Sequence, residues 1–174
     1  MLRSLFKSRP SRATAETLYA LAADQARTPA FYTRLGVADR IDARFELYTL
    51  HVLLLVLRLR HEGDQGAETA QALFDTYVSS LDDTLRELGV GDMAVAKKMR
   101  KLGEALYGRM QAYEAAIVEA DEAALSAALA RNVYESEDPA AGAALARYAL
   151  DSRARLADQP AATLAAGPHW GEIG

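Results

Sequence analysis

"LHVLLLVLRLR", residues 50–60, is apolar on nearly every side when it is drawn as a helix. A helix of this kind needs neighbours on several sides, because none of its faces suits water. The stretch is too short to cross a bilayer, which takes about 20 apolar residues, and Arg58 interrupts it. We therefore predict a helix over about residues 39–61 that lies at the centre of the fold.

The rest of the chain favours helix as well. Its 174 residues are 51% hydrophobic and 25% charged, and Ala, Leu, Arg and Glu outnumber Val and Ile. Those four are helix formers, and no segment alternates with the two-residue period of a strand. We predict an all-α, single-domain, irregular bundle of about six to seven helices around the central one. The other predicted helices cover about residues 14–27, 29–35, 67–88 and 92–119, and two more are capped by Asp121 and Asp138.

The two ends of the chain differ in composition from the predicted helical domain, residues 14–157. Residues 1–13 contain four basic residues and no acidic one, although the net charge of the chain is −4. We predict a flexible amino-terminal tail, whose residues 1–12 either touch an anionic membrane or only help to keep the chain in solution. Residues 158–174 are rich in Ala, Gly and Pro, and we predict a mobile carboxy-terminal tail.

The sequence offers little for catalysis. It has no cysteine, glycine-rich phosphate loop, nucleophile elbow or paired-carboxylate pattern, and we predict neither an enzyme nor a bound cofactor or metal. His51 raises the question of a haem ligand, although a packed core histidine is the favoured interpretation. His61 lies about 80° further round the helix, so the two do not form a metal pair. No apolar leader follows the first basic residues, and we expect a cytoplasmic protein.

The predicted helix over residues 92–119 has two unlike faces. Its apolar stripe, which we expect in the core, consists of Val95, Met99, Leu102, Leu106, Met110, Tyr113 and Ile117. The opposite face combines basic residues with Gly108, Ala112 and Ala115. An exposed glycine within a helix costs about 1 kcal/mol relative to alanine. This face therefore suits another helix, either the one after Asp138 or one from a partner.

Charge is unevenly distributed along this helix and beyond it. Five basic residues and one acidic residue lie from Lys97 to Arg109, whereas seven acidic residues and one basic residue lie from Glu114 to Asp138. The two segments could pair with each other, each exposed pair contributing less than about 1 kcal/mol. In the alternative interpretation the basic turn binds a partner.

Two segments carry a resemblance to a known family: "FELYTLHVLLLVLRLR", residues 45–60, and "LRELGVGDMAVAKKMRKLGEALYGRMQAY", residues 85–113. They combine an aromatic–His helix, a GVGD turn, a basic KKMRK turn and a YGR run. From about Thr28 to Glu119 the chain resembles the ubiquinol–cytochrome c chaperones, assembly factors for respiratory complex III in mitochondria and alphaproteobacteria. The resemblance implies a partner-binding surface made of Lys97, Lys98, Arg100, Lys101, Gly108, Arg109 and Tyr113.

The resemblance also implies how the protein acts. It implies a non-enzymatic chaperone that binds newly synthesised cytochrome b, with a small helper protein or the ribosome as further partners. Residues 1–12 would then hold the protein at the cytoplasmic face of the inner membrane. Two other interpretations stay open: a ribosome- or RNA-binding protein that uses the same basic surface, and a structural helical scaffold whose basic turn is paired internally.

Overall fold

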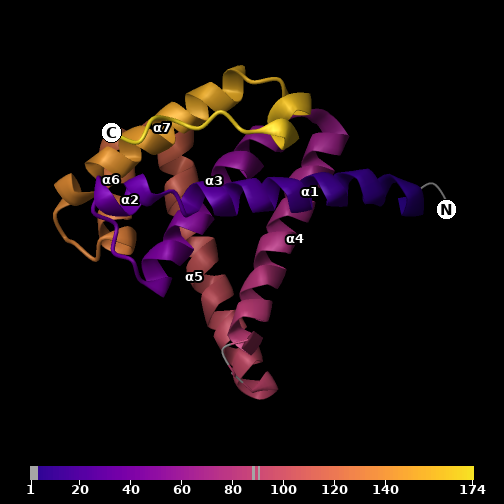
Figure 1. Ribbon diagram of the computed structural model, residues 1–174, viewed down its shortest axis with the longest axis horizontal. Coiled ribbons are helices and arrows are strands. Elements are labelled where there is room, and N and C mark those ends of the chain that lie inside the picture. Colours follow the sequence, from indigo (N-terminus) through magenta and orange to yellow (C-terminus); the bar gives the residue numbers. More distant parts are fainter. Residues whose placement is uncertain (1–3, 88, 90) are drawn as a thin grey trace.

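The computed structural model describes residues 4–87, 89 and 91–174, with the backbone alone at residues 4–10, 85, 92, 93, 96, 98 and 102. Within these residues the protein consists of helices and has no strand, as predicted (Figure 1). The α-helices are α1 (Ser4–Ala26), α2 (Pro29–Thr33), α3 (Ile41–Leu59), α4 (Gly63–Glu87), α5 (Asp92–Val118), α6 (Glu122–Val133) and α7 (Ala143–Asp158). Two 3₁₀ turns, η1 (Pro139–Gly142) and η2 (Ala161–Ala166), precede and follow α7.

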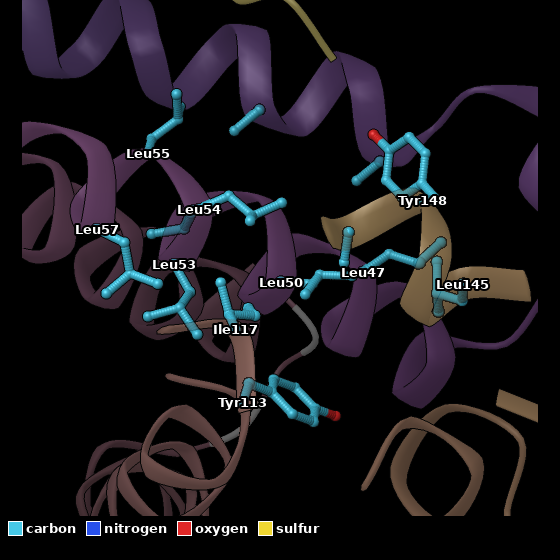
Figure 2. Close-up of a cluster of buried hydrophobic side chains, with 14 of the residues drawn as sticks. Leu47, Leu50, Leu53, Leu54, Leu55, Leu57, Tyr113, Ile117, Leu145 and Tyr148 are labelled. Atoms are coloured by element: carbon cyan, nitrogen blue, oxygen red, sulfur yellow. The ribbon is translucent and has the colours of Figure 1, made fainter. Parts of the chain in front are cut away.

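Helix α3 is the centre of the fold, which confirms the prediction made from its apolar run. It contacts α1, α4, α5, α6 and α7. Figure 2 shows its leucines pointing in several directions, toward Tyr113 and Ile117 of α5 and toward Leu145 and Tyr148 of α7. Each fully buried leucine contributes roughly 1.5–3 kcal/mol relative to an exposed one, so this helix supplies a large part of the folding free energy.

Helix ends follow local signals at most of the predicted positions. The Asp121 side chain accepts a hydrogen bond from Ala124 N at 2.9 Å, and that of Asp138 accepts one from Ala140 N at 3.0 Å. Both aspartates therefore satisfy amides that a helix start leaves without a partner. Several details differ from the prediction. Asp138 caps the 3₁₀ turn η1, and α7 begins only at Ala143, with Gly142 as its N-cap. Gly91, not Asp92, is the N-cap of α5, and α4 already begins at Gly63, inside the predicted connection.

The halves of α4 and α5 nearest their connection extend away from the rest of the molecule as a helical hairpin (Figure 1). We call residues 78–87 and 91–108 the arm. At its base, Tyr77 of α4 stacks with Phe45 of α3 at a centroid distance of 6.3 Å and exchanges a 2.7 Å hydrogen bond with Thr49. The base is therefore fixed to the central helix, whereas the arm itself projects from it.

The carboxy-terminal segment, residues 159–174, packs on the bundle, and the prediction of a mobile tail is wrong. Leu164 is buried, and Gly171 N donates to Ser152 Oγ at 2.8 Å. A Cβ on Gly171 would lie 2.7 Å from Tyr148 O, so the absence of a side chain permits this approach. Arg58, which interrupts the apolar run, donates to Leu156 O at 2.6 Å and to Gln159 O at 2.9 Å.

The amino-terminal tail also differs from the prediction. Helix α1 begins at Ser4, so most of the segment expected to be flexible continues the first helix. Most of residues 4–13 are tolerated within a helix, and their positive charge alone does not prevent helix formation. Residues 1–3 and the side chains of residues 4–10 lie outside the described part of the chain, including Arg3, Lys7 and Arg9.

Candidate functional site

A buried charged cluster joins α3 to α5 at the base of the arm. Glu46 of α3 has a side chain only 2% exposed, and it forms an ion pair with Arg109 of α5. The hydroxyl of Tyr113 donates to Glu46 Oε2 at 3.2 Å, and the Arg109 guanidinium lies 5.7 Å from the centre of the Phe45 ring. These contacts hold α5 against the central helix where the arm begins.

Burial dominates the electrostatics of this cluster. It raises the pKa of Glu46 to about 7, although Arg109 and the Tyr113 hydrogen bond both act to lower it. Burial and the neighbouring Glu46 carboxylate raise the pKa of the Tyr113 phenol, which therefore remains a hydrogen-bond donor. Sequence reasoning did not single out Glu46. The available signal was an acidic residue one turn before the apolar run of the central helix.

The structure separates the predicted contact residues into two groups. Lys97, Arg100, Lys101 and Gly108 are exposed on α5, and the side chain of Lys98 lies outside the described residues. Arg109 is partly covered, with 28% of its side chain exposed. Tyr113 is fully buried in the core, so the prediction that it belongs to a contact surface is wrong. The helical wheel had already placed Tyr113 on the apolar stripe of this helix.

No helix in the described part of the chain covers Gly108. A Cβ placed on Gly108 would have no heavy atom within 4 Å apart from its own helix and chain neighbours. The segment after Asp138, which was one predicted receiver, therefore does not pack on this glycine. A glycine in open space within a helix lowers helix stability by about 1 kcal/mol and gains nothing from close packing inside the chain.

The acidic segment forms no ion pair with the described side chains of the basic turn. Its ion pairs are Glu114 with Arg60, Glu122 with Arg147 at 3.3 Å and Glu135 with Arg40 at 2.8 Å. All three partners are arginines outside α4 and α5. Among the described side chains, Lys97, Arg100 and Lys101 take part in none of the ion pairs seen in the structure. The basic turn of the arm is thus left to solvent or to a partner.

Two of the large hydrophobic side chains that the described part of the chain exposes lie on α5. Tyr107 is 67% exposed and Val118 is 51% exposed. Eleven residues make about three helical turns, so the two lie within about 20° of one another on the helix surface. Gln111 Nε2, between them, donates to the Tyr107 hydroxyl at 2.9 Å. The exposed side of α5 therefore carries apolar residues and small residues as well as basic ones.

His51 is a packed core histidine. Its Nδ1 lies 2.7 Å from Leu47 O and its Nε2 lies 2.7 Å from the Tyr148 hydroxyl, which in turn accepts a hydrogen bond from Gln25. The carbonyl can only accept, so Nδ1 carries the proton and Nε2 accepts from Tyr148. Burial lowers the pKa of His51 to about 4 and keeps the ring neutral. Both nitrogens have protein partners, which argues against a haem ligand.

The fold and this surface define a single-domain, all-α protein with a projecting helical arm. The chain belongs to the ubiquinol–cytochrome c chaperone family, whose family model matches residues 33–170. In the part of the chain that the structure describes, no helix has the length and apolar character needed to cross a membrane.

Two relatives support this assignment. The chain is similar to the crystal structure of the Cbp3 homolog from Brucella abortus, with a TM-score of 0.82 and 35% identity over 99% of this chain and 97% of that one. It is also 23% identical over 103 residues to ubiquinol-cytochrome-c reductase complex assembly factor 1 of Xenopus laevis. That match covers 59% of this chain and 51% of the relative, so the chain spans about half the length of this curated protein.

Proposed function

We propose that this protein is an assembly chaperone for respiratory complex III and that it acts by binding, without catalysis. The observation that carries the proposal is the family match over residues 33–170, and the fold similarity along nearly the whole chain agrees with it. The buried clusters around Glu46 and His51 have their polar groups engaged within the protein. The exposed basic residues Lys97, Arg100 and Lys101 and the exposed Tyr107 all lie on α5.

The client that we propose is newly synthesised cytochrome b, bound through the exposed face of α5. Lys97, Arg100 and Lys101 attract an acidic or amphipathic segment, while Tyr107 and the open surface at Gly108 accept its apolar side. Binding of this kind covers a segment of the client until its own partners arrive, and so delays misassembly. A small helper protein or the ribosome is a second candidate partner of the same surface.

The test is recovery of cytochrome b from membranes of the native host. The triple variant Lys97→Glu, Arg100→Glu, Lys101→Glu is compared with the wild type and with the control Arg34→Glu, Arg131→Glu on exposed body positions. We expect cytochrome b with the wild type and the control, and at least about tenfold less with the folded triple variant. Absence of cytochrome b from the wild-type sample would contradict the proposed client. Equal recovery with all three proteins would contradict binding of cytochrome b through the basic face.

An RNA- or ribosome-binding protein is the second candidate function, because no ion pair neutralises Lys97, Arg100 or Lys101 within the described chain. Salt dependence separates the two functions. Binding to phosphates releases counterions and falls steeply as salt rises, whereas capture of a segment that also buries an apolar side falls less. Binding of the purified protein to an RNA oligonucleotide, measured at low and high salt beside cytochrome b recovery at the same salt concentrations, therefore separates them.

We further propose that the basic start of the chain binds the anionic surface of the inner membrane. Near such a surface each basic residue contributes about 1 kcal/mol. The variant Arg3→Gln, Lys7→Gln, Arg9→Gln is therefore expected to bind vesicles containing anionic lipid at least about tenfold more weakly than the wild type. Co-sedimentation measures the difference, with zwitterionic vesicles as the control. Unchanged binding to the anionic vesicles would contradict this contact.

A further inference from the structure

We propose that two copies of this protein associate through α5, antiparallel, about a twofold axis that passes beside Gly108. The surface concerned is the α5 stripe, which we define as Lys97, Lys101, Glu104, Gly108, Ala112, Ala115 and Glu119. All seven are exposed. On a helix with 100° per residue they fall within a sector of about 80°, so they form one continuous face.

The α5 stripe is complementary to itself in charge. Lys97 lies eleven positions before Gly108 and Glu119 lies eleven positions after it. Eleven residues make about three turns, so each lies within about 20° of Gly108 on the helix. In an antiparallel pair centred on Gly108, Lys97 of each copy therefore faces Glu119 of the other, and the contact occurs twice. A parallel pair would instead bring like charges together, so the charges select the antiparallel arrangement.

The middle of the α5 stripe permits close approach of two helix axes. Gly108 has open space where a Cβ would be, and Ala112 and Ala115 add only methyl groups. In the antiparallel pair Ala115 faces the aliphatic stem of Lys101 from the other copy, and Ala112 faces Glu104. Small residues at the crossing point let helices approach to about 8 Å. This contact would account for a glycine that has no packing role inside its own chain.

The charges at the two ends of the α5 stripe are available for this contact. Neither Lys97 nor Glu119 takes part in an ion pair among the described residues, since the acidic segment pairs with arginines of the body. About 33 Å of helix separates them, which is too far for pairing within one chain. A second copy supplies the matching charge at both ends at once.

The test is a reciprocal charge reversal measured by sedimentation equilibrium on the purified protein. Lys97→Glu alone places two acidic pairs in the dimer, and Glu119→Lys alone places two basic pairs. Each variant is expected to weaken self-association at least about tenfold. In an equimolar mixture of the two, the mixed dimer has an opposite-charge pair at both ends if the copies cross as proposed, so the mixture is expected to associate better than either variant alone. The decisive protein is the double variant Lys97→Glu, Glu119→Lys. It restores both opposite-charge pairs and is expected to associate with wild-type affinity.

Arg100→Glu is the matched control. It makes the same change of charge on the same arm, but Arg100 lies about 80° round the helix from Gly108, outside the α5 stripe. It is expected to leave self-association unchanged. A wild type that stays monomeric at every concentration, or a folded double variant that associates no better than the single ones, would overturn the proposal. Both measurements use the protein alone, so their failure leaves the client proposal intact. Because a second copy and the client would occupy the same face, the pair is proposed for the protein without its client.

Discussion

Gly142→Ala is expected to destabilise the protein by at least about 3 kcal/mol, because the new methyl group has no room. Gly142 ends η1, where this turn crosses α6. An added Cβ would lie 2.1 Å from Ser126 O and 2.7 Å from Ala130 N. Both atoms belong to the backbone of α6, so no side chain can rotate aside. The helix or the turn would have to shift, which would break the packing of α6 against η1.

Urea denaturation followed by helical circular dichroism measures this effect. Gly103→Ala, within α5 but outside the α5 stripe, is the matched control, since it makes the same change where nothing lies within 4 Å of the new methyl group. It is expected to stabilise the protein by about 1 kcal/mol through helix propensity alone. If the two variants changed the unfolding free energy by similar amounts in the same direction, the close crossing at Gly142 would be contradicted.

Glu46→Gln is expected to stabilise the protein at pH 8 by about 3 kcal/mol and to leave it unchanged at pH 4. The pKa of Glu46 rises from 4.5 to about 7 on folding. The folded state therefore prefers the protonated carboxyl group. Its contribution to stability is complete below pH 4.5 and is lost as the pH rises through 7. Glutamine is neutral at every pH, so the variant does not suffer this loss.

The contribution of His51 to stability depends on pH in the opposite direction, and its pH range overlaps that of Glu46. Its pKa falls from 6.5 to about 4 on folding, so its contribution is complete above pH 6.5 and is lost as the pH falls toward 4. In the wild type the two slopes oppose each other between about pH 4.5 and 6.5. In Glu46→Gln only the His51 slope remains, about 1.4 kcal/mol per pH unit, with stability increasing as the pH rises.

The measurement is the free energy of unfolding in urea from pH 4 to pH 8, for the wild type and the variant. Glu68→Gln, which makes the same substitution at an exposed position of α4, is the control. A Glu46→Gln protein that is less stable than the wild type at pH 8 would contradict the prediction. It would show that the ion pair with Arg109 outweighs the burial of the charge.

Much of the fold could be predicted because its signals are local. The apolar run of residues 50–60 requires neighbours on all sides, and Asp121 and Asp138 are suited to cap the segments that follow them. The prediction for the carboxy-terminal segment was wrong because it used only local signals of this kind. Alanine, glycine and proline are common in mobile tails, but the fit of Gly171 against Tyr148 O depends on a contact that composition cannot show.

The candidate site was predictable only in part. The exposure of Lys97, Arg100 and Lys101 follows from their place opposite the apolar stripe of α5. The cluster at the base of the arm was not predictable, because Glu46 is separated from Tyr113 by 67 positions and only the packing of α3 on α5 brings them together. Tyr113 was assigned both to the core and to a contact surface, and its burial shows that it belongs to the core.

Trp170 provides a spectroscopic probe of the contact between the carboxy-terminal segment and the central helix α3. It is the single tryptophan of the chain, and its ring lies edge-on to His51 at a centroid distance of 5.1 Å. Its fluorescence therefore reports whether the last residues rest on the central helix, whereas circular dichroism reports the helices as a whole. Detachment of this end would change the emission while the helical signal stayed nearly constant. Release of the carboxy-terminal segment can thus be followed in the unlabelled protein.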